Sequence, residues 1–442
     1  MTNHQPNVLL IMTDEERYPP PYEQGALAAF RRDHLPAHQG LRARSRELHR
    51  HYVGSTACVP SRATMFTGQY PSLHGVTNTD GLAKAANDPA MSFLDPDTVP
   101  TMGDWFRAAG HETHYRGKWH ISHADLLVTD THQRVRTNDG DGRVDPAAIE
   151  LYERAARLEP FGFAGWVGRE PHGAAKEDTG LVKLVDTAIM RIIDAFDASG
   201  MADDTIVVFT SDHGDLVGAH GGLVQKWHNA FDEAVRVPFM VSGAGIDPDD
   251  GGIDIPTSHV DLLPTLLGLA GIDREAAAAE VALRHIETQP LAGRDLSSLL
   301  HGRAGADALE APIYFMTEDQ VSLGLRGRNR LTQEPYEPVG QPAKVESVIA
   351  SQPTGPNDSS ELWKLNHYYE RLPEWEETHG IQWHPPAGPP VEPQWELHNL
   401  SADPEERTNL AGVATTTQDE LRRVLDTERD TERRVPTHRN PV

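Results

Sequence analysis

The chain has 442 residues, a net charge of −26 and a sequence pI of about 5.2. This length is compatible with one large domain and a smaller second one. The strong negative charge argues against sequence-independent binding of nucleic acids, which requires many lysine and arginine contacts to phosphate. An anionic substrate would therefore need a local pocket of positive charge within a repelling field.

The first apolar run, Val8 to Met12, predicts a buried parallel strand that ends at Thr13-Asp14-Glu15. The run is far too short for a membrane span or the core of a signal peptide. We therefore expect a cytoplasmic protein with no membrane partner. A helical stretch is expected around Leu41 to Leu48, and Pro60 suits the first turn of a further helix beginning near Cys58.

The middle of the chain alternates between expected helices and expected strands. These are a helix between Val99 and Gly110, a strand at His111–Tyr115, a helix at Leu181–Phe196, a strand at Thr205–Thr210, a strand at Arg236–Val241 and a helix at His259–Ala270. Such alternation predicts an α/β fold with a doubly wound, mostly parallel sheet flanked by helices.

The pattern changes after about Ala311, where short strand-like segments are separated by loops and a proline-rich stretch. Two such segments are Ile313–Met316 and Val345–Ala350. We expect a smaller C-terminal α+β domain with a short antiparallel sheet. The predicted domains are residues 1–310, which would hold the chemistry, and residues 311–442.

Candidate metal ligands follow two of the expected strands. Asp14 and Glu15 end the first strand, and Asp212 and His213 end the strand at Thr205–Thr210. Strand ends on one edge of a sheet meet in space, and Cys58 lies between these positions in the chain. Carboxylate oxygens with one imidazole suit a hard divalent cation, with Ca²⁺ expected first and Mn²⁺ or Mg²⁺ as alternatives.

Cys58 is the only cysteine, so it cannot form an internal disulfide or a cysteine-rich zinc site. It opens the run Cys58-Val59-Pro60-Ser61-Arg62, followed by Thr67-Gly68, and this run resembles the signature of the sulfatase family, which belongs to the alkaline phosphatase superfamily. The resemblance implies that a separate formylglycine-generating enzyme, a transient partner, oxidises this cysteine to formylglycine. The hydrated aldehyde would then be the nucleophile that attacks the sulfur of a sulfate ester.

The resemblance extends along most of the chain. Asn7–Glu15 is similar to the first metal-binding strand of the family, although two adjacent aspartates are usual where this chain has Asp14-Glu15. Further matching stretches are Gly117-Lys118-Trp119-His120, Thr210–Gly214, Gln225-Lys226 with Phe231–Pro238, and the closing motif that starts at Trp395.

The resemblance also implies roles for individual side chains. Arg62 would hold the hydrated aldehyde, Lys118 and Lys226 would bind the sulfate oxygens, and His120 would be the base for sulfate release. His172, which follows Pro171, is the candidate acid for the leaving oxygen. Their positions in the chain make Asn78 and His228 further candidates for contact with the substrate. A role in a turn is the alternative for Asn78, and a role in packing is the alternative for His228.

The expected function is therefore metal-dependent hydrolysis of a small-molecule sulfate ester to an alcohol or phenol and inorganic sulfate. A phosphonate or phosphate ester hydrolase on the same scaffold is one alternative, although Lys118 and His120 tend to be replaced in that branch. The other alternative is a catalytically silent metal-binding protein with an unmodified Cys58. An oligomer is compatible with the sequence.

Overall fold

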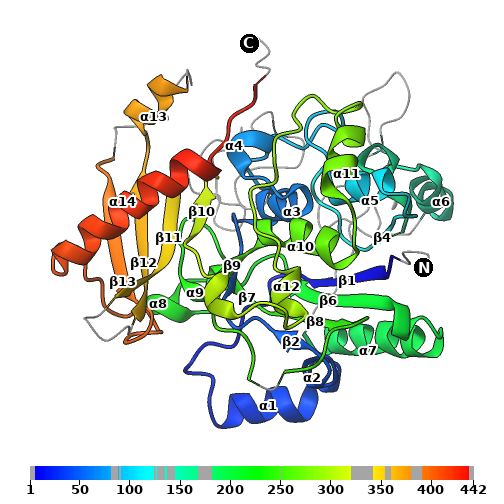
Figure 1. Ribbon diagram of the computed structural model, residues 1–442, viewed down its shortest axis with the longest axis horizontal. Helices are drawn as coiled ribbons and strands as arrows, with labels where there is room; N and C mark the ends of the chain where they lie inside the picture. The colour runs from blue at the N-terminus through cyan, green and yellow to red at the C-terminus, as the bar shows by residue number, and fades with distance from the viewer. Residues whose placement is uncertain are drawn as a thin grey trace.

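The computed structural model describes residues 5–80, 88, 91–123, 126, 135–136, 145–167, 182–249, 251–319, 342–353, 360–379 and 391–437. Figure 1 shows two regions, a larger one with helices on both sides of a sheet and a smaller one with a sheet crossed by a long helix. Within these ranges no helix is long and apolar enough to cross a membrane.

The sheet of the larger region has four strands in the order β1-β6-β8-β2. Their bounds are β1 Asn7–Thr13, β6 Thr205–Ser211, β8 Phe239–Gly243 and β2 Arg46–Glu47. β1 and β6 pair in parallel, whereas β8 is antiparallel to β6, and β2 is antiparallel to β8. The α/β class is thus confirmed, and the pairing is more mixed than the mostly parallel sheet that we expected. Between β6 and β8 only the four-residue helices α8 (Ala219–Gly222) and α9 (Asp232–Val235) form, so the long crossover helix typical of parallel pairs is replaced by loops.

Side chains alternate between the two faces of β1 and β6, as the period of a strand requires. One face packs on α2 (Pro36–Ala43) and α7 (Val182–Ala198), and the other packs on α3 (Cys58–Thr67) and α10 (Leu262–Leu269). Leu9, Ile11, Val207 and Phe209 belong to the first cluster, and Val8, Leu10, Ile206 and Val208 belong to the second. In Figure 1 the helices α2 and α7 lie below the sheet, and α3 and α10 lie above it.

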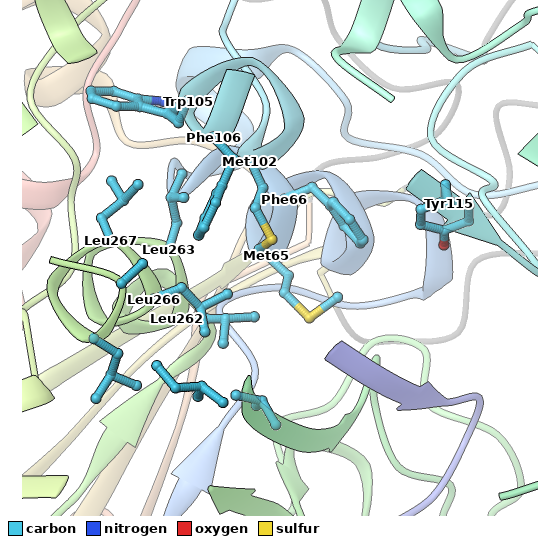
Figure 2. Close-up of a cluster of buried hydrophobic side chains, with 14 of the residues drawn as sticks. Met65, Phe66, Met102, Trp105, Phe106, Tyr115, Leu262, Leu263, Leu266 and Leu267 are labelled. Carbon is cyan, nitrogen blue, oxygen red and sulfur yellow. The ribbon is translucent and has the colours of Figure 1, made fainter. Parts of the chain in front are cut away.

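Apolar packing also fixes α3, the helix that begins at Cys58. Figure 2 shows Met65 and Phe66 of α3 among side chains of α5 (Met102–Ala108) and of α10. All ten residues of α3 are buried. A helix enclosed in this way can hold its first residue in one place relative to the strand ends.

The smaller region contains an antiparallel sheet in the order β10-β11-β12-β13. Its strands are β10 Ile313–Thr317, β11 Lys344–Pro353, β12 Ser360–Tyr369 and β13 Gln394–Asn399. The helix α14 (Thr415–Glu432) buries Leu421 and Leu425 in one cluster with residues of this sheet, and Figure 1 shows it lying across the strands. The expected C-terminal antiparallel sheet is confirmed, while the domain boundary at residue 310 stays a prediction.

Most of the expected elements are present with shifted ends. The strand expected at Arg236–Val241 is divided at Pro238 into β7 (Arg236–Val237) and β8, because proline cannot donate to the ladder. β7 pairs with β3 (His51–Tyr52), which also pairs with β9 (Thr257–Ser258). The helix expected around Leu41 to Leu48 is wrong, since α2 ends at Ala43 and β2 follows.

The remaining described elements are α1 Ala26–His34, α4 Pro71–His74, β4 His114–Arg116, α6 Pro146–Arg154, β5 Ala164–Val167, α11 Arg274–Val281, α12 Ser297–Leu300 and α13 Pro373–Thr378, with 3₁₀ turns at Glu159–Phe161, Ala202–Asp204, His259–Asp261 and Ala306–Ala308.

Candidate active site

Two aspartates lie side by side at the carboxyl ends of β1 and β6. The parallel register pairs Thr13 with Ser211, so the next residues, Asp14 and Asp212, leave the sheet at the same edge. The backbone N–H of Asp212 donates to the carbonyl of Thr13 at 3.2 Å. Asp212 is fully buried, whereas the Asp14 side chain is 44% exposed. One carboxylate is therefore fixed in the interior and the other borders solvent.

The helix α3 brings Cys58 to this edge. The Ser61 hydroxyl donates to the carbonyl of Asp212, which ties the first turn of the helix to the end of β6. Cys58 is the first residue of the helix, and its Sγ lies 3.0 Å from His213 Nε2. The positive end of the helix dipole thus points at the thiol.

Four side chains form one cluster of possible metal-binding groups: Asp14, Cys58, Asp212 and His213, whose ligand atoms all lie within 4.8 Å of one another. His213 Nδ1 is 2.8 Å from the carbonyl of Gly214, to which it donates, and this bond leaves Nε2 as the ring nitrogen that faces the cluster. Burial lowers the pKa of His213, but the neighbouring Asp212 and Cys58 outweigh this effect and raise it to about 9.

Glu15 is not a member of this cluster. Its backbone has a positive φ of 61°, and its carboxylate contacts Lys226 Nζ. The backbone N–H of Glu15 donates to Asp212 Oδ1 at 3.1 Å. Of the five residues expected to bind the metal, the structure therefore brings four together and pairs the fifth with a lysine.

A buried guanidinium joins the parts of the cluster. Arg62 Nε donates to Asp212 Oδ2 at 2.8 Å, and its Nη1 donates to the carbonyl of Lys118 at 2.7 Å. Its Nη2 lies 3.4 Å from Asp14 Oδ1. Burial opposes the charge of Arg62, yet the two aspartates raise its pKa. Arg62 therefore positions both carboxylates and the segment that carries Lys118.

Two lysines make the surroundings of Cys58 electropositive within an acidic protein. Lys118 Nζ lies 2.7 Å from Asp14 Oδ1, and Lys226 Nζ contacts Glu15. Burial raises the pKa of the Cys58 thiol, but Lys118, Lys226 and His213 together hold it well below its usual value. The site thus stabilises negative charge at position 58.

His120 lies beside the carboxylate of Asp80, a residue that no sequence motif indicated. Its Nε2 is 2.6 Å from Asp80 Oδ1, and both side chains are only 2% exposed. Cys58 also lies near His120. Burial opposes protonation of His120, but Asp80 and Cys58 raise its pKa. Asp80 lies in a short polar stretch that reads as a turn, so no local pattern marked it.

The other predicted site residues have different surroundings. Asn78 is buried, and its Nδ2 donates to the Thr77 hydroxyl at 3.0 Å. His228 Nδ1 lies 3.1 Å from the carbonyl of Ala343, just before β11. His172 lies outside the described residues.

A family model described as Sulfatase matches residues 6–128 and 164–272, more than half of the chain. An ulvan-active sulfatase of Formosa agariphila is 27% identical over 336 residues, which cover 61% of this chain and 62% of that protein. The chain thus spans less than two thirds of the length of this relative.

Two solved structures share the fold over nearly the whole chain. A 2-O GAG sulfatase aligns with a TM-score of 0.58 and 19% identity, covering 96% of this chain and 92% of the other. The phosphonate monoester hydrolase of Silicibacter pomeroyi aligns with a TM-score of 0.58 and 17% identity, covering 97% and 96%. At these identities the likeness concerns the fold alone.

Proposed function

Because the chain belongs to the sulfatase family, we propose that it hydrolyses a small-molecule sulfate ester to an alcohol or phenol and inorganic sulfate. The observation that carries this proposal is the meeting of Cys58 with two carboxylates, one imidazole and two lysines at one edge of the sheet. A thiol surrounded by fixed positive charge within a protein of net charge −26 fits a site for an anionic substrate.

The proposal includes one divalent cation, held by Asp14, Asp212, His213 and position 58, with Glu15 as a fifth candidate ligand. The donor set fits such a group because two carboxylates and an imidazole nitrogen already converge within 4.8 Å. Ca²⁺ is proposed first, and Mn²⁺ or Mg²⁺ are the alternatives. A bound cation would supply Lewis-acid stabilisation of the charge that develops on the sulfuryl oxygens.

The proposal also includes oxidation of Cys58 to formylglycine by a separate enzyme. What supports it is the match of Cys58 to Arg62 with the family signature and the placement of Cys58 within the charged cluster. The hydrated aldehyde would supply the hydroxyl nucleophile.

The other side chains would bind the substrate and transfer protons. Lys118 and Lys226 would bind sulfate oxygens as point charges, and Arg62 would keep Asp14 and Asp212 in place. His120 would take up a proton during sulfate release, and His172 would protonate the leaving oxygen.

The remaining substrate contacts are proposed for Asn78 and His228. Asn78 lies two residues before Asp80, the partner of His120. His228 follows Lys226 by two residues.

Matched substrates separate this proposal from its nearest alternative. The test compares the turnover of three esters that share one leaving group: an aryl sulfate, the corresponding aryl phosphonate and the corresponding aryl phosphate. The proposal expects the sulfate to have the higher kcat/KM, and a tenfold preference corresponds to about 1.4 kcal/mol in transition-state binding. A preference for the phosphonate would assign the chain to phosphonate ester hydrolysis instead.

Mass spectrometry of the peptide that contains Cys58 tests the second alternative. Formylglycine has a different mass from cysteine. An unmodified thiol in material purified from the native host, together with no turnover of any ester, would support a catalytically silent metal-binding protein.

A further inference from the structure

Asp80 and His120 form a buried pair between two segments that are 40 residues apart in the chain. Asp80 follows α4, and His120 follows β4. The Asp80 Oδ1 atom lies 2.6 Å from His120 Nε2, and each side chain is 2% exposed. A charged group that is so deeply buried normally requires a specific partner, and His120 meets this requirement.

The chain around Asp80 is held from a second direction. The backbone N–H of Thr79 donates to Asp319 Oδ2 at 3.3 Å, just after β10. The segment that carries Asp80 is thereby anchored on the end of the second sheet. The Asp80 carboxylate is in this way given a fixed place against which the imidazole can be oriented.

The chemistry of the pair decides where the proton of the ring resides. An ionised carboxylate can only accept a hydrogen bond, so His120 Nε2 must be the donor. The neutral imidazole then has an acceptor at Nδ1, which is the form that a proton-accepting base requires. His120 also has a positive φ of 57°, a strained backbone conformation of the kind that persists at functional sites when its surroundings hold it.

We propose that Asp80 is a positioning residue, which accepts a hydrogen bond from His120 Nε2 and so holds the His120 ring in one orientation and one tautomer. This inference rests on the proposed sulfate ester hydrolysis for its kinetic consequence, but the tautomer and orientation can be measured without turnover.

The test uses Asp80→Asn, His120→Asn and the double variant in the full chain. The proposal expects kcat for an aryl sulfate to fall by about 10²–10⁴-fold in Asp80→Asn, while KM changes only a few-fold. It also expects Asp80→Asn to have little further effect in the His120→Asn background, since the two residues act as one unit.

A second readout does not depend on activity. Nitrogen NMR of protein labelled at its histidine rings reports which nitrogen carries the proton, and His120→Asn identifies the signals of His120. The wild-type protein should show the proton on Nε2, and Asp80→Asn should shift the balance toward Nδ1. If Asp80→Asn does not fold, Asp80→Ser removes the same charge with a smaller side chain.

A matched control comes from a buried pair with the same separation on the other face of the sheet. His38 Nδ1 lies 2.6 Å from Asp186 Oδ1, between α2 and α7. Asp186→Asn should lower stability but leave kcat and the His120 signals unchanged. If it lowers kcat as much as Asp80→Asn does, the effect of Asp80 is merely structural and the proposal is overturned.

The outcomes keep the two proposals apart. Wild-type protein with formylglycine that hydrolyses no sulfate ester would refute the proposed function, while the NMR measurement would still decide the role of Asp80. Active protein with the His120 proton on Nδ1, or a kcat of Asp80→Asn within about threefold of wild type, would refute the role of Asp80 alone.

Discussion

Arg62 and Asp212 form an ion pair in the interior, with 2.8 Å between Nε and Oδ2 and with 2% and 0% of their side chains exposed. The same arginine also bonds to the carbonyl of Lys118 and approaches Asp14. One guanidinium thus connects α3, the end of β1, the end of β6 and the segment after β4. Both the stability of the fold and the geometry of the site therefore depend on Arg62.

Replacing Arg62 with alanine should therefore lower stability as well as activity. The change leaves Asp212 buried without its main partner, and breaking a buried pair in this way costs about 3–5 kcal/mol. Arg62→Lys keeps the charge but loses the planar fork, so it should recover only part of the stability. Chemical denaturation measures the unfolding free energy of both variants. Arg294→Ala, which breaks the pair with Asp261 elsewhere, should lower stability without changing activity.

Cys58→Ala and Cys58→Ser should both lose turnover of sulfate esters while they remain folded. Alanine has no nucleophile, and a serine hydroxyl would keep the transferred sulfuryl group as a stable ester. Cys58→Ser should release at most one equivalent of alcohol per protein molecule, as a burst experiment measures. Repeated turnover by Cys58→Ser at nearly the wild-type rate would contradict the proposed role of formylglycine.

Removal of divalent cations should abolish activity and lower the unfolding temperature. A ligand that binds only the folded state stabilises it by about 2.7 kcal/mol at a concentration of 100 times its Kd. Thermal unfolding with EDTA, and then with added Ca²⁺, Mn²⁺ or Mg²⁺, measures this effect. Asp212→Asn should remove the response to the cation. Activity that persists after complete chelation would refute the metal dependence.

Glu15 and Asp14 should differ in their effects on cation binding. Asp14 belongs to the cluster of possible ligands, whereas the carboxylate of Glu15 contacts Lys226. Calorimetric titration should therefore show a loss of affinity of at least about tenfold for Asp14→Asn and a smaller loss for Glu15→Gln. Equal losses would support Glu15 as a full ligand that rotates away from Lys226 when the cation binds.

The C-terminal sheet should lose stability in acid through Glu346. Burial raises the pKa of this carboxyl, but bonds from His367 and Arg429 outweigh it and lower the pKa to about 2. Because the folded pKa lies below the unfolded value of about 4.5, the stabilisation is complete above that value and is lost as the pH falls toward 2. The stabilisation that is lost over this pH range is about 3 kcal/mol. Glu346→Gln should flatten the dependence of unfolding free energy on pH between about 5 and 2.

Some of the site could be predicted from the sequence because its residues follow apolar strands directly. Asp14 and Asp212 each come one residue after a strand, and parallel neighbours end at one edge. The side chain of Glu15 could not be placed in this way, because its positive φ turns it toward Lys226, a residue 211 positions later.

Asp80 could not be predicted because its role depends on a loop that meets His120 only in the folded protein. The antiparallel direction of β8 could not be predicted either. An apolar run indicates a buried strand but does not give its orientation, which depends on the connection that precedes it.

The register between β1 and β6 determines how accurately Asp14 and Asp212 are placed relative to each other. Sliding one strand past the other by a single residue would move Asp14 by about 3.3 Å relative to Asp212. The same slip would exchange the side chains that face α3 with those that face α7, so two hydrophobic layers would be disrupted together. The apolar residues of β1 and β6 therefore fix the positions of Asp14 and Asp212 relative to each other. A change of register would unfold the protein, so no folded form with a misplaced carboxylate would result.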